Sequence, residues 1–325
     1  MVVPDLKHLF NYCAVPWYEK ELQEKNLLLE DYVRQHNLNG IERLIYQNEV
    51  MEKSYREIVT RVHLAYWPYW LDFWLQDHER MSLQFGDKEE LKNGYAGADN
   101  TEAWLELIKQ NIESALLEKP EYLVWHVADC NRHEPYTYKF HYTDSEVVEA
   151  AADVFNEISG NIPEDVVVLF ENLWWPGLRL RDNKVTELFF NRINRKQVGI
   201  ILDTGHLLNT EDNLANENDA IDFICHTVKS FGELKNLIKG LHLSCSLSAD
   251  YRRSFPKIVP KENNFSTLFE HMNKIDQHKP FTNRRVLEIL ELTDPEYVVH
   301  ELAYDTFDDL DGVLNTQLKA CNILR

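Results

Sequence analysis

Four apolar runs along the chain each end in a residue type that binds metal ions. The clearest is Gly-Ile-Ile-Leu, which runs into Asp203, and a Thr-Gly turn then delivers His206. Three further runs end in the same way, at Glu171, at His242 and at Glu301. A buried parallel strand that carries a carboxylate or an imidazole at its carboxyl end is typical of barrel enzymes, which hold their sites there. We therefore predict that these residues lie together on one rim of a barrel.

Apolar and amphipathic segments alternate through the whole chain. Strands are expected over residues 6–13, 40–46, 61–66, 121–126, 166–170, 199–202, 238–241 and 297–300. Helices are expected over residues 26–35, 53–59, 101–117, 144–158, 219–237 and 282–290. Alternating strands and helices require a parallel sheet with right-handed crossovers, and eight strands most naturally close into an α/β (β/α)8 TIM barrel. An open doubly wound sheet is the alternative, although the sequence has no Gly-x-Gly-x-x-Gly or phosphate-loop motif.

Residues 67–100 interrupt this alternation of strands and helices after the third strand. The segment begins with a run of tryptophans and continues as a polar, glycine-containing stretch. Long connections inside compact domains are usually functional or mobile. We predict a long cap-forming loop after strand three that covers the mouth of the barrel. No Pro/Ser linker or shift in composition divides the chain, so a single domain over residues 1–325 is expected.

The composition limits the partners and the compartment. The chain has 54 acidic and 34 basic residues and a formal net charge of −20, which disfavours nucleic acid and anionic membranes as partners. No apolar run approaches the roughly 20 residues that span a bilayer, and residues 1–5 do not resemble a signal peptide. The five cysteines show no Cys-x-x-Cys spacing, so reduced thiols are expected. A cytoplasmic protein is the default expectation.

The strand-end residues indicate a chemistry. Three carboxylates and one imidazole, from Glu171, Asp203, Glu301 and His242, suit a divalent ion such as Mn, Mg, Zn, Co or Fe, with open positions for substrate oxygens. Such an ion polarises a carbonyl group while a neighbouring carboxylate moves a proton. For each acid taken alone, a helix N-cap or a satisfied rim residue is the alternative interpretation.

The set Glu171, Asp203-x-x-His206, His242 and Glu301, each at a strand end and in this order, resembles the xylose isomerase-like TIM barrel superfamily. That group includes sugar phosphate isomerases and epimerases, ketose 3-epimerases and endonuclease IV. The resemblance covers nearly the whole chain, and the Asp-Thr-Gly-His run is its most specific part. It implies metal ligation by Glu171, Asp203, His242 and Glu301, and contact of His206 with substrate or with an oxygen atom on the ion. It also implies that Glu171 and Glu301 form the catalytic acid/base pair.

Two more histidines fit positions of this superfamily. His63 and His126 match sites that hold additional zinc ions in endonuclease IV, while substrate binding or a purely structural role are the alternatives. Residues 244–252, directly after His242, contain no Asp-x-His pair, so a full three-metal cluster is not expected. Together with the acidic charge, this places DNA repair second among the predicted functions.

Three other residues are candidates for substrate contact. The arginine that ketose 3-epimerases place after their histidine ligand is Ser248 here, and Arg252 or Arg253 is the candidate replacement. Trp67 and Trp174 belong to two tryptophan-rich segments near the same rim and could stack on a sugar ring. Their alternative role is to pack the cap or to bury a subunit interface in a homo-oligomer.

The leading hypothesis is a divalent-metal-dependent isomerase or epimerase of carbohydrate metabolism, acting on a small sugar, sugar phosphate, keto-sugar or polyol. One glutamate would remove a carbon-bound proton and the other would return it. The alternatives are a keto-polyol dehydratase, an endonuclease IV-like metal-dependent phosphodiesterase, and a barrel that binds metal without catalysis.

Overall fold

The structure, a computed structural model, describes residues 6–46, 58–85 and 87–324. Within these residues, eight parallel strands form a closed barrel in which each strand pairs with its neighbours in chain order and β8 pairs with β1. The strands are β1 Lys7–Cys13, β2 Gly40–Leu44, β3 Val59–His63, β4 Tyr122–His126, β5 Val167–Glu171, β6 Val198–Asp203, β7 Ile238–Leu243 and β8 Tyr297–His300. The (β/α)8 TIM barrel predicted from the alternation is confirmed.

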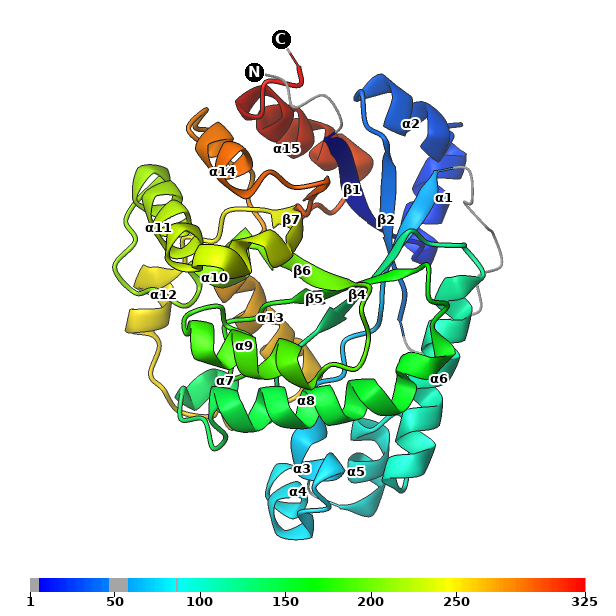
Figure 1. The fold of residues 1–325 in the computed structure, drawn as a ribbon, viewed down its shortest axis with the longest axis vertical. Coiled ribbons are helices and arrows are strands. Elements are labelled where there is room, and N and C mark those ends of the chain that lie inside the picture. The colour runs from blue at the N-terminus through cyan, green and yellow to red at the C-terminus, as the bar shows by residue number, and fades with distance from the viewer. Residues whose placement is uncertain (1–5, 47–57, 86, 325) are drawn as a thin grey trace.

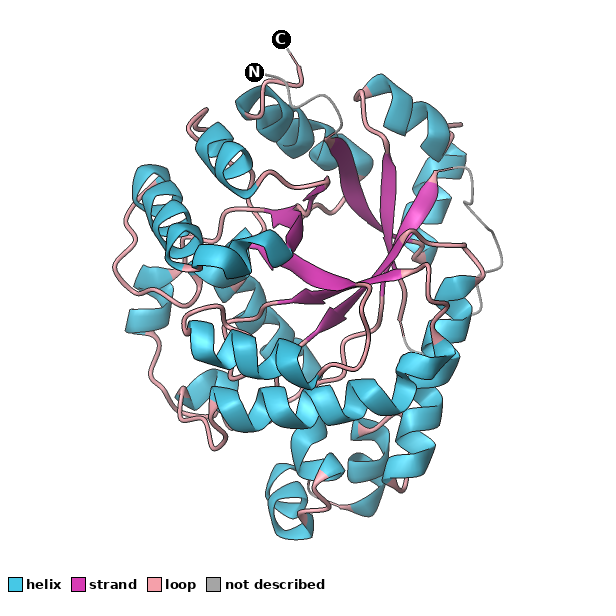
Figure 2. Cartoon of the chain, viewed as in Figure 1, coloured by secondary structure: helices cyan, strands magenta, loops and turns pink. Residues whose placement is uncertain are grey.

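Helices surround the strands, as Figures 1 and 2 show. They are α1 Pro16–Glu24, α2 Leu29–Gln35, α3 Trp70–Trp74, α4 His78–Gln84, α5 Lys88–Gly94, α6 Thr101–Leu116, α7 Glu134–Thr137, α8 Asp144–Ile158, η1 Ser159–Asn161, α9 Asn183–Arg192, α10 Thr204–Leu208, α11 Glu217–Ser230, η2 Gly232–Leu237, α12 Ala249–Ser254, α13 Phe265–Ile275, α14 Val286–Thr293 and α15 Phe307–Ala320. Among the described helices, none is long and apolar enough to cross a membrane.

The strand expectations hold to within about three residues, and the helix expectations are less complete. The helix expected over residues 53–59 lies outside the described residues except at its end, where Val59 begins β3, and residues 1–5 also lie outside them. Helix α6 starts at Thr101, but its N-cap is Asn100, whose side chain accepts a hydrogen bond from Ala103 N. The expected helices do not include α9, α12, α13 and α15, although the apolar residues of α13 do recur at helical spacing.

The upper layer of the barrel interior carries the polar residues. Below it, Leu9, Val124, Leu169, Ile201 and Val299 form an apolar layer with no solvent exposure. Side chains on a strand alternate between inside and outside, so the residue two positions beyond each of these also points inward. On four of these strands that residue is a histidine or a carboxylate, which places the ligand-type side chains on a floor of close-packed aliphatic groups.

The connection between β3 and α6 forms three short helices, α3, α4 and α5, which lie together at one end of the molecule in Figure 1. Trp70 Nε1 donates a hydrogen bond to Ala128 O at 2.8 Å, and Leu71 N donates to Asp129 Oδ1 at 3.0 Å. The connection is therefore attached to the loop that follows β4. That it caps the mouth of the barrel stays a prediction.

Burial, assisted by the nearby carboxylates of Asp72 and Glu134, raises the pKa of Asp129 to about 7 although Leu71 N donates to it. The folded protein therefore binds a proton that the unfolded chain has released, and stability falls as pH rises from about 4 to 7. We expect Asp129→Asn to be stabilising above pH 7 by about 2–4 kcal/mol and close to neutral at pH 4. Thermal unfolding of both proteins across this pH range measures the difference. A constant difference at all pH values would contradict it.

Candidate metal centre

Glu171, Asp203, His242 and Glu301 meet at the carboxyl ends of β5 to β8. Each offers one ligand atom, and these atoms all lie within 4.8 Å of one another. His242 Nδ1 is 3.0 Å from Glu301 Oε2 and 3.4 Å from Glu171 Oε1. The strand register aligns Asp203 with His242 on the neighbouring strand, which explains how residues distant in sequence converge. We call these four residues the central group.

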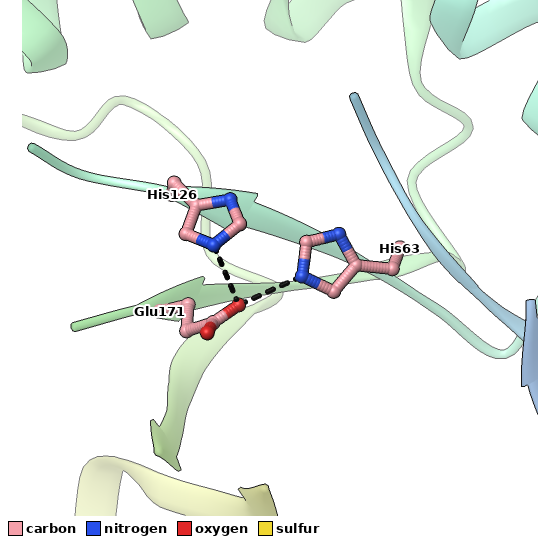
Figure 3. A group of neighbouring side chains, drawn as sticks. All are labelled: His63, His126 and Glu171. Atoms are coloured by element: carbon pink, nitrogen blue, oxygen red, sulfur yellow. Dashed lines mark hydrogen bonds and ion pairs between the residues drawn. The ribbon is translucent and has the colours of Figure 1, made fainter. Parts of the chain in front are cut away.

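Glu171 also belongs to a second group, with His63 from β3 and His126 from β4 (Figure 3). Glu171 Oε2 lies 2.8 Å from His63 Nε2 and 3.3 Å from His126 Nε2, while Oε1 faces the central group. One carboxylate thus presents one oxygen atom to each group. A carboxylate in this position can bridge two metal ions.

A third group joins His206 to two residues that follow α13, Asp276 and His278. Asp276 Oδ2 is 3.2 Å from His206 Nε2 and 2.7 Å from His278 Nε2. His206 Nδ1 is also 3.1 Å from Glu171 Oε1, so this third group adjoins the central one. Three ligand groups therefore lie side by side on one rim.

The Asp-x-His pair that residues 244–252 lack is present later in the chain. The pair is Asp276-Gln277-His278, and the helices α12 and α13 separate it from His242. The sequence assigns His278 no role, because it suggests a helix or a surface segment there. The Asp-x-His spacing is visible in the sequence, but only the fold shows that an insertion of two helices returns it to the rim.

The tautomers of the histidines fit metal ligation. The Nδ1 atoms of His63, His206 and His278 lie 2.9, 2.9 and 3.2 Å from the backbone carbonyls of Leu64, Asn172 and Glu301. A carbonyl accepts only from a protonated nitrogen, so in the neutral form of each imidazole the lone pair lies on Nε2 and is directed into its group. Such outer hydrogen bonds orient metal-binding histidines.

Orphaned polar atoms in the central group also fit a metal ion. Within the described part of the chain, Glu171 Oε1, Asp203 Oδ2, His242 Nδ1 and Glu301 Oε2 have no hydrogen-bond partner although each atom is buried. Leaving such atoms unsatisfied costs free energy that an ion would recover. Two imidazoles with one carboxylate, as in the second and third groups, is a common zinc donor set.

Charge is concentrated in the three groups. Burial raises the pKa of Asp203 well above its usual value, and the carboxylates of Glu301 and Glu171 raise it further. Burial opposes the charge on His278, but Asp276 outweighs it and raises the pKa of His278 to about 10. Burial would raise the pKa of Glu171 as well, yet the surrounding imidazoles hold it well below its usual range. In the metal-free protein, protons on the histidines therefore compensate the carboxylates, and divalent ions would take over this role.

The Asp-Thr-Gly-His run is folded as the start of a helix rather than as a loose turn. Asp203 is the N-cap of α10, and its Oδ1 accepts a hydrogen bond from His206 N while Oδ2 faces the central group. Gly205 is required by close approach, because a Cβ there would lie 2.6 Å from Ser244 Oγ. The carboxylate of Asp203 thus caps a helix with one oxygen and faces the central group with the other. From the sequence alone, these two roles are alternatives.

Glu42 on β2 is a functional candidate that sequence reasoning missed. Its Oε1 lies 2.9 Å from His242 Nε2, and its Oε2 accepts a hydrogen bond of 2.6 Å from Tyr122 OH. The side chain is 1% exposed. Glu42 therefore lies at ion-pair distance from the outer nitrogen of His242, whose other nitrogen, Nδ1, faces the central group. In the sequence, Glu42 is one acid inside a short strand, and nothing local marks it.

We expect Glu42→Gln to weaken metal binding about 10–100-fold, because an amide stabilises the imidazole of His242 less than a carboxylate does. Competition with a chromogenic chelator measures this affinity. Glu187→Gln, an exposed change on α9, is the matched control. Equal metal affinity in the Glu42 and Glu187 variants would rule out the positioning role.

The three other residues predicted to contact substrate lie in different surroundings. Trp174 lies beside the third group, with its ring centroid 5.1 Å from that of His206. Trp67 is buried and packs edge-on against Trp104 of α6. Arg252 is 4% exposed, and its guanidinium is held by Ser248 Oγ, by Asp212 and by the carbonyl of Glu211. Of these three residues, Trp174 is the one whose ring packs against a histidine of the ligand groups.

No protein-family model and no curated protein sequence matches the chain. Among solved structures, endonuclease IV from Thermus thermophilus is 11% identical, covers 97% of this chain and 99% of its own, and has a TM-score of 0.52. A structure described as AsfvAP:AG is 12% identical, with 97% and 98% coverage and a TM-score of 0.50. L-ribulose 3-epimerase is 10% identical, with 97% and 86% coverage and a TM-score of 0.47. The chain shares the closed (β/α)8 TIM barrel fold with these structures.

Proposed function

We propose that this chain is a metal-dependent phosphodiesterase of the endonuclease IV type. The observation that carries the proposal is the presence of three ligand groups on one rim, joined through Glu171 and through the contact of His206 with Glu171. The second group would hold one ion, the central group another and the third group a third. Solved structures that share the fold include endonuclease IV, which supports the proposal at the level of architecture.

Ions held at these positions would polarise a phosphoryl oxygen, lower the pKa of a water molecule and stabilise the charge of the leaving oxygen. The chain's own residues supply position and electrostatics. Glu171 fixes the spacing of two groups, because each of its oxygens faces a different one. Glu301 is the least buried member of the central group, at 15% side-chain exposure, so it can face a substrate. The apolar floor below keeps the site rigid.

The proposed function differs from the one that the sequence favoured, which was a sugar isomerase or epimerase. A sugar isomerase of the predicted kind needs one ion and two proton-transferring carboxylates, which the central group alone provides. Such an isomerase leaves His63, His126, Asp276 and His278 without a function. Yet backbone carbonyls orient the imidazoles of His63, His206 and His278, which all lie outside the central group. Sites with two or more ions, which stabilise both the attacking and the leaving oxygen, are instead typical of phosphoryl transfer.

An isomerase or epimerase of a small sugar or sugar phosphate is the second candidate. Two observations favour it: Glu171 and Glu301 both lie in the central group, and Trp174 packs beside His206 where a sugar ring could stack. In this case Glu171 and Glu301 would be the acid/base pair, as the resemblance implies. The substrate would be a small molecule rather than a polymer.

The test compares the two reactions on the same preparation. Protein loaded with zinc or manganese is given bis(p-nitrophenyl) phosphate and a duplex with an abasic site, and separately a panel of keto-sugars in deuterated water. We expect release of nitrophenolate or strand cleavage, and no deuterium in the sugars. Deuterium incorporation without any phosphodiester hydrolysis would overturn the phosphodiesterase and establish the second candidate.

A further inference from the structure

A cluster of aromatic rings and lysines lies beside the rim and is not used by the three ligand groups. It is formed by Tyr138, Tyr251, Phe255, Lys257 and Lys274, and we call it the aromatic-lysine patch. We propose that this patch binds a single-stranded segment of nucleic acid. The inference names the substrate class of the proposed phosphodiesterase and rests on that function for catalysis, although not for binding.

The rings form a continuous series along an open groove. Tyr138 and Phe255 lie 5.6 Å apart between centroids, as do Tyr251 and Phe255, and Tyr136 stacks on His271 at 4.6 Å. Four of these rings, from Tyr136, Tyr251, Phe255 and His271, line a groove of about 500 Å³ between α7, α12 and α13. Successive aromatic faces are the surface on which unpaired bases stack, with little dependence on sequence.

Positive charge accompanies the rings. Lys257 Nζ lies 3.8 Å from the centroid of Phe255 and 4.0 Å from that of Tyr138, and Lys274 Nζ lies 5.7 Å from that of Tyr251. Among the described residues, neither lysine has a carboxylate within ion-pair distance, although Glu270 also lines the groove. The chain as a whole carries −20, and of the eight Lys/Arg in residues 250–285, Arg252, Arg253 and Arg285 are ion-paired with carboxylates, whereas, in the described part of the chain, Lys257 and Lys274 are not. The acidic total therefore conceals a local site for a polyanion.

The patch is continuous with the third ligand group. Helix α13 carries Lys274 and ends at Ile275, and Asp276 follows directly. Ile275 packs in one apolar cluster with Trp174 and Trp175, and Tyr138 and Tyr251 pack against that cluster. The patch and the third ligand group thus adjoin the same buried cluster, which places them next to one another.

The chemistry favours a single strand over the other polyanions. A duplex hides the faces of its bases, and an acidic peptide brings charge but few flat rings for the series to stack on. The ring of Tyr136 lines the groove, and its buried hydroxyl has no hydrogen-bond partner among the described residues. Single-strand binders combine aromatic platforms with lysines in the same way.

The test measures binding without catalysis. Full-length protein is freed of metal with EDTA, and fluorescein-labelled oligothymidylate is titrated by fluorescence anisotropy at several salt concentrations. We expect Lys257→Glu and Lys274→Glu each to lower the affinity about tenfold and to reduce the salt slope by about 0.7. Phe255→Ala is expected to lower the affinity about tenfold with an unchanged slope. Lys235→Glu on η2, which precedes β7 at the other end of the barrel, is the matched control.

Two results would overturn the inference. One is equal oligothymidylate affinity in the patch variants and the control, with all proteins folded by circular dichroism. The other is tighter binding of duplex DNA or of polyglutamate than of the single strand. Hydrolysis of bis(p-nitrophenyl) phosphate by the metal-loaded variants is measured in parallel. Because this small substrate does not reach the patch, its hydrolysis reports on the proposed function separately.

Discussion

Glu171→Gln is expected to abolish phosphodiester hydrolysis and to lower the bound metal from three ions per chain to about one. Each carboxylate oxygen of Glu171 faces a different ligand group, and glutamine replaces one oxygen by an NH2 group that cannot bind a metal ion and the other by a neutral, weaker amide oxygen. Loss of two ions removes most of the stabilisation of the transferring phosphoryl group. The rate should therefore fall about a thousandfold or more, which corresponds to a rise of ~4 kcal/mol in the activation free energy. Elemental analysis and steady-state kinetics measure the two effects.

Glu187→Gln on α9 is the control for this change, because it makes the same substitution on an exposed helix face. Circular dichroism checks that both variants are folded. Full metal content in Glu171→Gln would show that this carboxylate does not bridge two groups. Retained hydrolysis with normal metal content would sink the whole three-ion arrangement.

Asp276→Asn is expected to remove one ion of the three and to reduce the rate of phosphodiester hydrolysis about a hundredfold. This corresponds to a rise of ~3 kcal/mol in the activation free energy. Asp276 Oδ2 is the atom that His206 Nε2 and His278 Nε2 both approach, and an asparagine would offer a neutral oxygen in its place. The change leaves the second and central groups intact. The number of ions and the rate should therefore fall together, but less than in Glu171→Gln.

This variant also separates the two candidate functions. A sugar isomerase that uses only the central group should keep its activity when Asp276 is changed, because none of the four central residues is altered. Asp250→Asn on the neighbouring helix α12 is the control, since Asp250 is exposed and pairs only with Arg253 among the ion pairs of the described residues. An unchanged ion count in Asp276→Asn would remove the third group from the proposal.

The fold and the central group could be predicted from the sequence because both depend on local features. A buried parallel strand reads as a short apolar run, and its carboxyl end is the next residue along the chain. Glu171, Asp203, His242 and Glu301 each occupy that position, and a closed barrel brings neighbouring strand ends together. The convergence of these four therefore follows from the barrel itself, without knowledge of any loop.

The residues that were missed or left open depend on longer connections. Asp276 and His278 stand on a loop after two unexpected helices, so their distance from His206 is set by the path of that insertion. Glu42 gains its role from the curvature of the barrel, which brings β2 opposite β7. For Arg252, which with Arg253 stays a prediction for substrate contact, the structure adds contacts of the guanidinium with the loop after α10.

By itself, the sequence determined the order of the strands, the barrel class and the four candidate ligand residues at the strand ends. Only the tertiary structure decided how many ligand groups there are, which carboxylate joins them and where the lysines gather on an acidic protein. The physical reason is that periodicity and strand ends are properties of neighbours in sequence, whereas ligand distances and surface charge are properties of neighbours in space. A chain of −20 can therefore present a positive patch, and a motif split by two helices can complete a metal site.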